Sequence, residues 1–210
     1  MSMSGVWNVG NIAKFQANLI PNSRAFIFED VPITFKELNE RSNQMANYLL
    51  STGIKKGDRL AIYLQNCPEF IYLFFAAAKI GLILVPLNLR LVGRELEYQL
   101  NNSGSSMLFF HAKFFDNVNK IRGNIQVDKD KYIWLPGSDT DAPPCPDWAV
   151  RFHDHIDKFP FTEPVVKEQV FFEDPLGIIY TSGVTGAPKG AVVNHSQSYF
   201  KVISLTGTAA

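Results

Sequence analysis

Short apolar runs alternate with longer amphipathic runs along most of the chain. Residues 58–64, 82–86 and 106–111 have the length and the β-branched or aromatic content of buried strands. Residues 68–80 and 93–100 lie between them and have the spacing of helices. Strands joined through a helix can run parallel to one another. We therefore predict an α/β fold, with a doubly wound, mostly parallel sheet and flanking helices.

The N-terminal residues predict a helix, a strand and a second, capped helix. Residues 15–20 have helical spacing, and residues 24–28 read as a strand. Thr34 and Glu37 match a capping box, in which each side chain satisfies a free N–H group at a helix start. The helix that follows carries one apolar face, and Gly53 is expected to end it.

The regular pattern is lost over residues 136–164, which are rich in Pro, Asp and Gly. We interpret them as a long surface connection and as a subdomain boundary. The predicted division is an N-terminal α/β subdomain over residues 1–165 and the start of a second over residues 166–210. In the second part, residues 176–180 predict a buried strand, and residues 196–205 a helix.

One apolar stretch, residues 70–89, is long enough to suggest a membrane span. Lys79 lies in its middle, where a charge costs about 2.5–3.5 kcal/mol on insertion scales. Gly81 and Pro86 divide the stretch into a helical part and a strand-like part. We interpret it as buried core and predict no transmembrane segment.

Composition excludes several classes of protein. A hydrophobic content of 46% with 19% charged residues is typical of a globular chain. Twenty basic residues balance twenty acidic ones, so nothing favours a nucleic-acid partner. Cys67 and Cys145 form no disulfide framework, and residues 1–10 do not resemble a signal peptide, so we expect a cytoplasmic protein.

Three histidines, His153, His155 and His195, are candidates for a metal or catalytic site. His153, Asp154 and His155 lie close together but lack the four-ligand spacing of a zinc site. We read them as solvated loop residues and assign no metal ligand. His195 follows the glycine-rich stretch described next, and a structural role at a helix start is favoured over a chemical one.

The glycine-rich stretch, residues 180–190, reads Tyr-Thr-Ser-Gly-Val-Thr-Gly-Ala-Pro-Lys-Gly. Glycine backbones can turn N–H groups toward an anion. Ser182 and Thr185 add hydroxyl donors, and Lys189 adds a charge suited to phosphate. The spacing differs from a P-loop, because two residues separate Gly186 from the lysine. The residues predict a nucleotide phosphate loop, and an ordinary turn remains the alternative.

This stretch resembles the phosphate-loop signature of the AMP-forming acyl-adenylate superfamily, which includes acyl-CoA synthetases, luciferases and adenylation domains of peptide synthetases. Val184 departs from it, since the family usually has Thr or Ser there. Residues 33–38 and 77–88 are similar to upstream motifs of the family. Residues 86–90, Pro-Leu-Asn-Leu-Arg, are more similar to acyl-CoA ligases than to peptide-synthetase domains.

The resemblance implies the fold and the reaction. The fold would be an incomplete part of the large N-terminal domain of adenylate-forming enzymes. The reaction would join a carboxylate to the α-phosphate of ATP and then transfer the acyl group to CoA, with Mg²⁺ assisting. The residues it implies for the β- and γ-phosphates are Thr181, Ser182, Gly183, Thr185, Gly186 and Lys189. It places no catalytic residue in this chain, since the adenine, ribose, metal and CoA sites follow the loop in the family.

Three hypotheses follow. The first is the N-terminal part of an ATP-dependent acyl-CoA synthetase for a long- or medium-chain fatty acid or an aryl acid. We expect this chain by itself not to turn over. The second is an amino-acid adenylation domain or a luciferase-like enzyme. The third is a fragment without catalysis that self-associates through exposed apolar surface.

Overall fold

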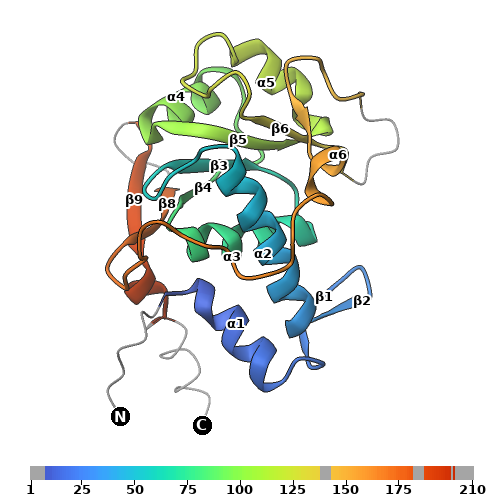
Figure 1. The fold of residues 1–210 in the computed structure, drawn as a ribbon. Helices are drawn as coiled ribbons and strands as arrows, with labels where there is room; N and C mark the ends of the chain where they lie inside the picture. Colours follow the sequence, from blue (N-terminus) through green and yellow to red (C-terminus); the bar gives the residue numbers. More distant parts are fainter. Residues whose placement is uncertain (1–7, 138–142, 182–186, 200, 202–210) are drawn as a thin grey trace.

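The computed structural model describes residues 8–137, 143–181, 187–199 and 201. Figure 1 shows a central sheet with helices on both faces. The helices are α1 (Gly10–Leu19), α2 (Phe35–Ser51), α3 (Pro68–Ile80), α4 (Gly93–Ser103), the 3-10 turn η1 (Ala112–Phe114), α5 (Phe115–Ile121) and α6 (His153–Ile156). The strands are β1 (Arg24–Phe28), β2 (Val31–Thr34), β3 (Arg59–Tyr63), β4 (Ile83–Pro86), β5 (Ser105–His111), β6 (Tyr132–Leu135), β7 (Val150–Arg151), β8 (Pro175–Thr181) and β9 (Lys189–Asn194).

The main sheet has the order β7-β6-β5-β3-β4-β8-β9 among the described residues. All neighbouring strands are parallel except β8 and β9, which pair antiparallel. β1 and β2 form a separate antiparallel hairpin. The chain passes from β3 to β4 on one side and then returns to β5 on the other side of β3. This confirms the predicted α/β fold with a doubly wound, mostly parallel sheet.

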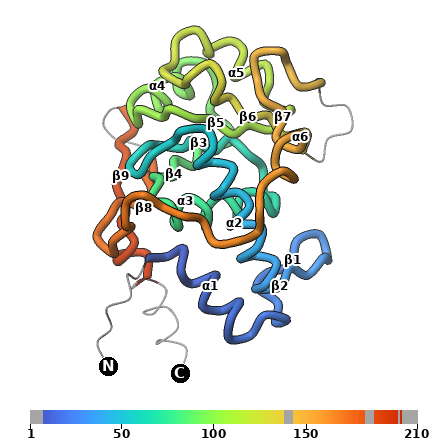
Figure 2. Tube along the Cα trace, viewed as in Figure 1, coloured from blue at the N-terminus to red at the C-terminus, as the bar shows by residue number. Residues whose placement is uncertain are grey.

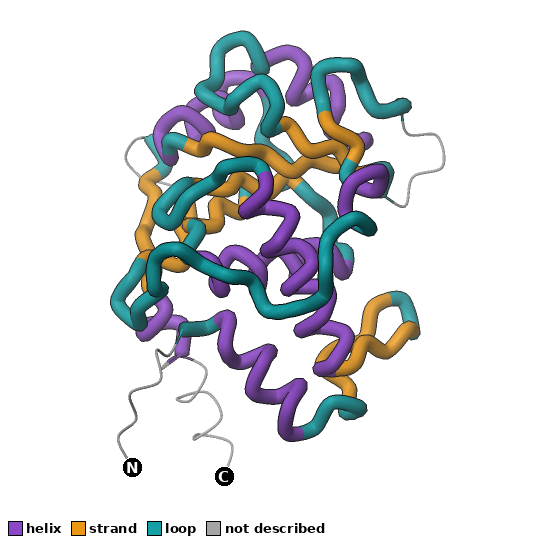
Figure 3. Tube along the Cα trace, in the orientation of Figure 1, coloured by secondary structure: helices purple, strands orange, loops and turns teal. Residues whose placement is uncertain are grey.

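Alternate residues of each strand face opposite layers of helices. Leu60 and Ile62 belong to a core cluster shared with α2 and α3. Ala61 and Tyr63 belong to a second cluster, shared with α4 and α5. Figure 3 shows the two helical layers in purple on either side of the orange sheet. Because both faces are buried, β3 reads as a continuous apolar run, as parallel strands do.

Several local predictions are confirmed. Residues 24–28 form a strand and residues 68–80 a helix. Thr34 caps α2, because its hydroxyl oxygen accepts a hydrogen bond from the Glu37 backbone N–H group at 3.2 Å. The apolar stretch at residues 70–89 is divided between α3 and β4, with Gly81 in the left-handed conformation between them. None of the described helices is long and apolar enough to cross a bilayer.

The interpretation of residues 136–164 as a connection without regular structure is wrong at two short elements, β7 and α6. β7 pairs with β6 and extends the sheet. Phe152 and Ile156, at the start and end of α6, are buried in the core against α2. His153 and His155 are exposed, in agreement with the solvated position predicted for them, but they lie on this short helix and not in a loop. The elements are too short for a periodic pattern to reveal them.

The segment after α6, residues 159–163, is held against α2 by a row of amide side chains, and we call it the strap. The chain runs beneath α6 and across the α2 side of the molecule in Figure 2. Asn43 and Asn47 donate side-chain N–H groups to backbone carbonyl groups of the strap at 2.9–3.0 Å. Gln44 donates to Phe159 at 3.3 Å. These bonds satisfy backbone groups that no strand pairing satisfies.

Candidate functional site: a hairpin loop for nucleotide phosphates

The predicted phosphate loop joins two antiparallel strands. Thr181, the last residue of β8, pairs with Lys189, the first residue of β9. Both residues are exposed. The structure therefore brings these two predicted site residues together at one end of the hairpin. The other four predicted residues, Ser182, Gly183, Thr185 and Gly186, lie outside the described residues.

The sequence did not predict β9. Lys189 was assigned to the loop, but it opens a strand that extends to Asn194. The described residues 195–199 and 201 are helical, so a helix begins one residue before the predicted start. Strand pairing fixes the backbone of Lys189, which a loop position would not do. The side chain of Lys189 therefore starts from a fixed backbone position, paired with Thr181 in the strand register.

β8 joins the sheet through a close approach to β4. Their register pairs Leu84 with Gly177. A Cβ atom on Gly177 would lie 3.1 Å from the carbonyl oxygen of Leu84, so glycine permits this contact. β8 was predicted to be buried, but its burial alternates, and Ile179 is 46% exposed. Because β8 runs parallel to β4, Thr181, the last residue of β8, lies at the side of the sheet formed by the carboxyl ends of the parallel strands.

The stretch that carries the ligase resemblance lies at the same edge, directly after β4. The Tyr63 hydroxyl group, at the end of β3, donates a hydrogen bond to the Leu91 carbonyl oxygen at 2.6 Å. The Arg90 backbone N–H group donates to the Asn88 side-chain oxygen at 2.9 Å. The first bond ties the turn between β4 and α4 to the end of β3, and the second lies within the turn.

Gly190 has a packing role behind the loop. It pairs with Tyr180 across the hairpin. A Cβ atom on Gly190 would lie 2.7 Å from Ile178 Cγ2 and 3.2 Å from Tyr180 Cζ. Real Cβ atoms do not come that close, so a side chain here would displace Ile178 or the tyrosine ring. The last glycine of the motif therefore allows the Tyr180 ring to lie across β9.

Two tyrosines connect the flanks of the loop to α4. The Tyr98 hydroxyl group donates to the carbonyl oxygen of Pro188 at 3.1 Å, one residue before Lys189. The Tyr180 hydroxyl group donates to the Asn102 side-chain oxygen at 2.7 Å, one residue before Thr181. Burial raises the pKa of Tyr180, so this hydroxyl remains a donor at neutral pH.

The roles of Tyr98 and Asn102 beside the loop were not predicted from the sequence. Each lies about eighty to ninety positions from its hydrogen-bond partner in the sequence. Helical periodicity predicts which residues share a helix face, but it does not indicate a contact with so distant a segment.

His195 has the structural role that the sequence favoured. It is fully buried, and its Nδ1 accepts a hydrogen bond from the Val9 backbone N–H group at 3.1 Å. Burial lowers the pKa of His195 to about 4, against an opposite effect of Asp174 and with a smaller contribution from Lys56. The ring is therefore neutral at pH 7. It joins the segment before α1 to the residue after β9.

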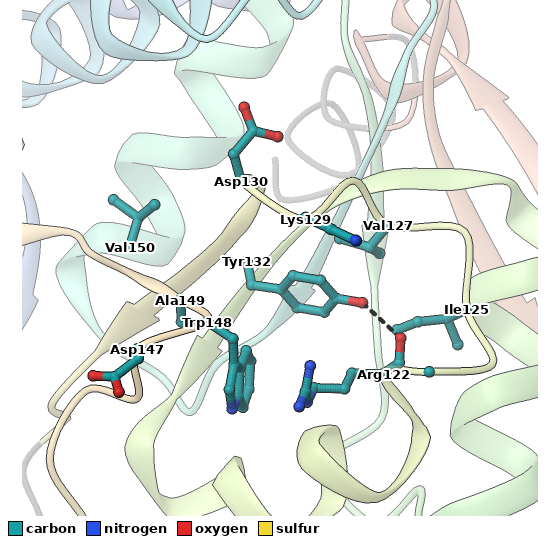
Figure 4. Close-up of a pocket in the computed structure, with 11 residues that line it drawn as sticks. Arg122, Ile125, Val127, Lys129, Asp130, Tyr132, Asp147, Trp148, Ala149 and Val150 are labelled. Atoms are coloured by element: carbon teal, nitrogen blue, oxygen red, sulfur yellow. Dashed lines mark hydrogen bonds between the residues drawn. The ribbon is translucent and has the colours of Figure 1, made fainter.

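A hollow of about 790 Å³ lies beside β6 and β7, at the other end of the strand order from β8 and β9. Figure 4 shows Tyr132 and Trp148 in its wall, with the Tyr132 hydroxyl group donating to the Arg122 carbonyl oxygen at 3.2 Å. Its lining residues precede β6 and β7, where these parallel strands begin. Thr181 and Lys189, which flank the predicted phosphate loop, lie where the parallel strands end, so this hollow is not part of the same candidate site.

The comparisons with known proteins agree with the fold. The sequence profile described as "AMP-binding enzyme" matches residues 14–209. The chain therefore belongs to the AMP-binding enzyme family.

Among the curated relatives, crotonobetaine/carnitine–CoA ligases of Salmonella agona and Salmonella typhimurium are each 34% identical over 200 residues. Those matches cover 93% of this chain but only 38% of each relative.

Solved structures give the same result. The anthranilate CoA ligase AuaEII, in complex with anthranoyl-AMP, matches with a TM-score of 0.83 and 26% identity, over 97% of this chain and 38% of that one. The N-terminal domain of FACL13 from Mycobacterium tuberculosis matches with a TM-score of 0.73 and 31% identity, over 90% of this chain and 44% of that one. The chain thus resembles the N-terminal part of acyl-CoA ligases.

Proposed function

We propose that this chain is the phosphate-binding N-terminal part of an ATP-dependent acyl-CoA synthetase. The observation that carries the proposal is the pairing of Thr181 with Lys189 at the ends of a glycine-rich hairpin loop. The family match and the ligase relatives support it. Because the matches cover only 38% of those ligase relatives, the reaction of the whole protein is also part of the proposal.

In the proposed site, the six residues Thr181, Ser182, Gly183, Thr185, Gly186 and Lys189 hold the β- and γ-phosphates of ATP. Backbone N–H groups of the glycines and the hydroxyl groups donate to phosphate oxygens, and the ammonium group of Lys189 offsets their charge. Both described members are exposed and accessible to a nucleotide. The described residues contain no group of three side chains suited to a metal ion. The family resemblance places the Mg²⁺ site after the loop, so no residue of this chain is assigned as a metal ligand.

The loop's task is electrostatic. When a carboxylate attacks the α-phosphate, negative charge gathers on the departing pyrophosphate, and fixed donors lower the barrier without having to reorganise. Strand pairing behind Lys189 and the hydrogen bond from Tyr98 to Pro188 fix that donor in advance. CoA then takes the acyl group. A fatty or aryl acid is the proposed substrate, in line with relatives named for fatty acyl, anthranilate and carnitine substrates.

Three further expectations remain proposals. Residues 166–210 would begin a second subdomain, although β8 and β9 already extend the sheet of the first. A cytoplasmic location is supported by Cys67 and Cys145, which are both free thiols. Self-association would use exposed apolar side chains such as Val192, which is 58% exposed.

The test is acid-dependent release of pyrophosphate from ATP by a protein of this sequence extended to the length of its relatives. A panel of fatty, aryl and amino acids distinguishes the branches of the family. We expect a fatty or aryl acid to stimulate release and Lys189→Ala to reduce it. Stimulation by amino acids alone would favour an adenylation domain, and no stimulation by any acid would contradict the proposal.

A further inference from the structure

A cavity of about 310 Å³ opens between the ends of β3 and β5. Cys67, after β3, and His111, the last residue of β5, line it together with Glu69 in the first turn of α3. β3 leads to α3 on one face of the sheet, while β5 leads to α5 on the other. Neighbouring parallel strands whose connections diverge in this way form the usual ligand crevice of α/β sheets. The phosphate loop follows β8, which β4 separates from β3.

His111 presents an unused donor to this cavity. Its side chain is 3% exposed, and its Nδ1 accepts a hydrogen bond from the Gln65 backbone N–H group at 3.0 Å. Burial lowers the pKa of His111, so the ring is neutral and its one proton is on Nε2. No hydrogen bond within the described ranges engages Nε2. A ligand oxygen in the cavity could accept a hydrogen bond from this N–H group.

Gly137 gives the ring its room on one side. It has a φ of +71°, and a Cβ atom there would lie 3.4 Å from His111 Cγ. The imidazole is thus fixed by a backbone hydrogen bond on one nitrogen and by close backbone on one face. A fixed donor loses little conformational entropy when a ligand binds.

The charges around the cavity favour a cation. Glu29 and Glu69 line it together with His111 and His153, and no Lys or Arg is among its described lining residues. Burial, with a smaller effect of Glu69, raises the pKa of the Cys67 thiol to about 12, so that group stays neutral. The described residues hold no group of three metal-ligating side chains, which argues against a bound metal ion. An organic ammonium ion needs only one carboxylate partner. An oxygen atom on the same molecule can accept the hydrogen bond from His111.

We propose that this cavity binds a small organic ammonium ion that carries an oxygen acceptor. The ammonium group pairs with the Glu69 carboxylate, and the oxygen accepts a hydrogen bond from His111 Nε2. The site is separate from the phosphate loop and does not depend on the proposed reaction.

The test is titration of this 210-residue protein with ethanolamine, followed by calorimetry and by the ¹⁵N signals of the histidine rings. Glycolate is the matched probe, since it has similar size and a hydroxyl group but the opposite charge. We expect ethanolamine to saturate the site, with an affinity on the order of millimolar for so small a molecule, and to shift the His111 Nε2 signal. Glycolate should give neither effect.

Two variants test the two contacts. Glu69→Gln removes the charge and should weaken ethanolamine about tenfold or more. His111→Asn keeps an acceptor for the Gln65 N–H group, removes the Nε2 donor and should weaken binding in the same way. Glu95→Gln, in the first turn of α4, is the matched control and should leave binding unchanged. Thermal unfolding of each variant verifies that it is folded.

Absence of a saturable ethanolamine response in the unmodified protein would overturn the proposal. Tighter binding of glycolate would overturn the assigned ligand class. Unchanged affinity in folded Glu69→Gln would show that the carboxylate is not the partner, and it would likewise reject the site as described.

Discussion

Lys79 Nζ lies 2.9 Å from Glu163 Oε2, and this ion pair links the buried face of α3 to the strap. The Lys79 side chain is 3% exposed and that of Glu163 is 36% exposed. Asn39 completes the arrangement, because its side-chain oxygen accepts from Lys79 and its N–H group donates to Glu163. The lysine that made a membrane span improbable is therefore a buried cation with partners from two other segments.

Removing the carboxylate should leave Lys79 charged and buried. We expect Glu163→Gln to lower the free energy of unfolding by about 2–3 kcal/mol, below the value for a fully buried pair because water reaches Glu163. Urea denaturation measures the change. Glu40→Gln is the control, since its pair with Lys36 is exposed and 4.0 Å long. A loss no larger than that of the control would show that the pair does not stabilise the strap.

The same pair predicts a pH dependence. Burial alone would raise the pKa of Glu163, but hydrogen bonds from Asn39 and Lys79 and the lysine charge outweigh it and lower the pKa. The unfolded chain therefore binds a proton at Glu163 more tightly than the folded chain does. The ion pair stabilises the fold fully above the ordinary pKa of Glu163, and this stabilisation is lost as the pH falls through the lowered pKa of the folded protein. Unfolding of the unmodified protein at pH 5 and pH 3 should differ more than that of Glu163→Gln. Equal differences would contradict this origin.

His195 predicts a second pH dependence, at higher pH. Its folded pKa of about 4 lies below the ordinary value of 6.5, so the unfolded chain binds more protons between these values. Stability should fall by up to about 3 kcal/mol as the pH drops through this range. His195→Asn keeps an acceptor for the Val9 N–H group and should flatten the profile. An unchanged slope, or equal flattening by His155→Asn on the surface, would count against a buried neutral ring.

Tyr98 should position Lys189 through the Pro188 carbonyl group. We expect Tyr98→Phe to weaken MgATP binding by a few-fold, because the lost hydrogen bond contributes about 0.5–1.5 kcal/mol. Tyr132→Phe removes an equivalent O–H group at the opposite edge, in the hollow of Figure 4, and should leave ATP binding unchanged. Calorimetry compares the two. Equal affinities for both variants would remove the positioning role.

Gly190 should tolerate no side chain. Gly190→Ala places a Cβ atom 2.7 Å from Ile178 Cγ2, so the hairpin must shift, at a cost of about 1–3 kcal/mol. Gly123→Ala is the control, because nothing lies within 4 Å of its Cβ position. Thermal unfolding distinguishes them, and equal melting temperatures would mean that β9 adjusts freely. The ATP affinity of Gly190→Ala should fall with its stability.

The sequence predicted elements whose signals are local. α3 has Pro68 in its first turn and Gly81 at its end, and both boundaries were correct. β3 and β4 are short apolar runs around that helix, and their parallel pairing follows from the connection. Each of these signals comes from neighbouring residues, so no information about distant segments was needed.

The missed features depend on distant partners. β9 has mostly exposed residues, so it carries no apolar alternation, and its pairing with β8 defines it. Phe152 is an aromatic residue in a polar segment, and only the core against α2 explains its burial. The Tyr98 contact with Pro188 likewise joins segments far apart in the chain. The loop motif itself was found because its chemistry is concentrated in eleven consecutive residues.

The most direct test of the account is calorimetric titration of this chain with MgATP. We expect saturable binding that Lys189→Ala weakens about tenfold or more, because a charge-assisted contact to phosphate is lost. Lys120→Ala, an exposed lysine in the last turn of α5, should bind like the unmodified protein. Equal heats for Lys189→Ala and the unmodified protein would contradict the assignment of the hairpin loop to ATP phosphates.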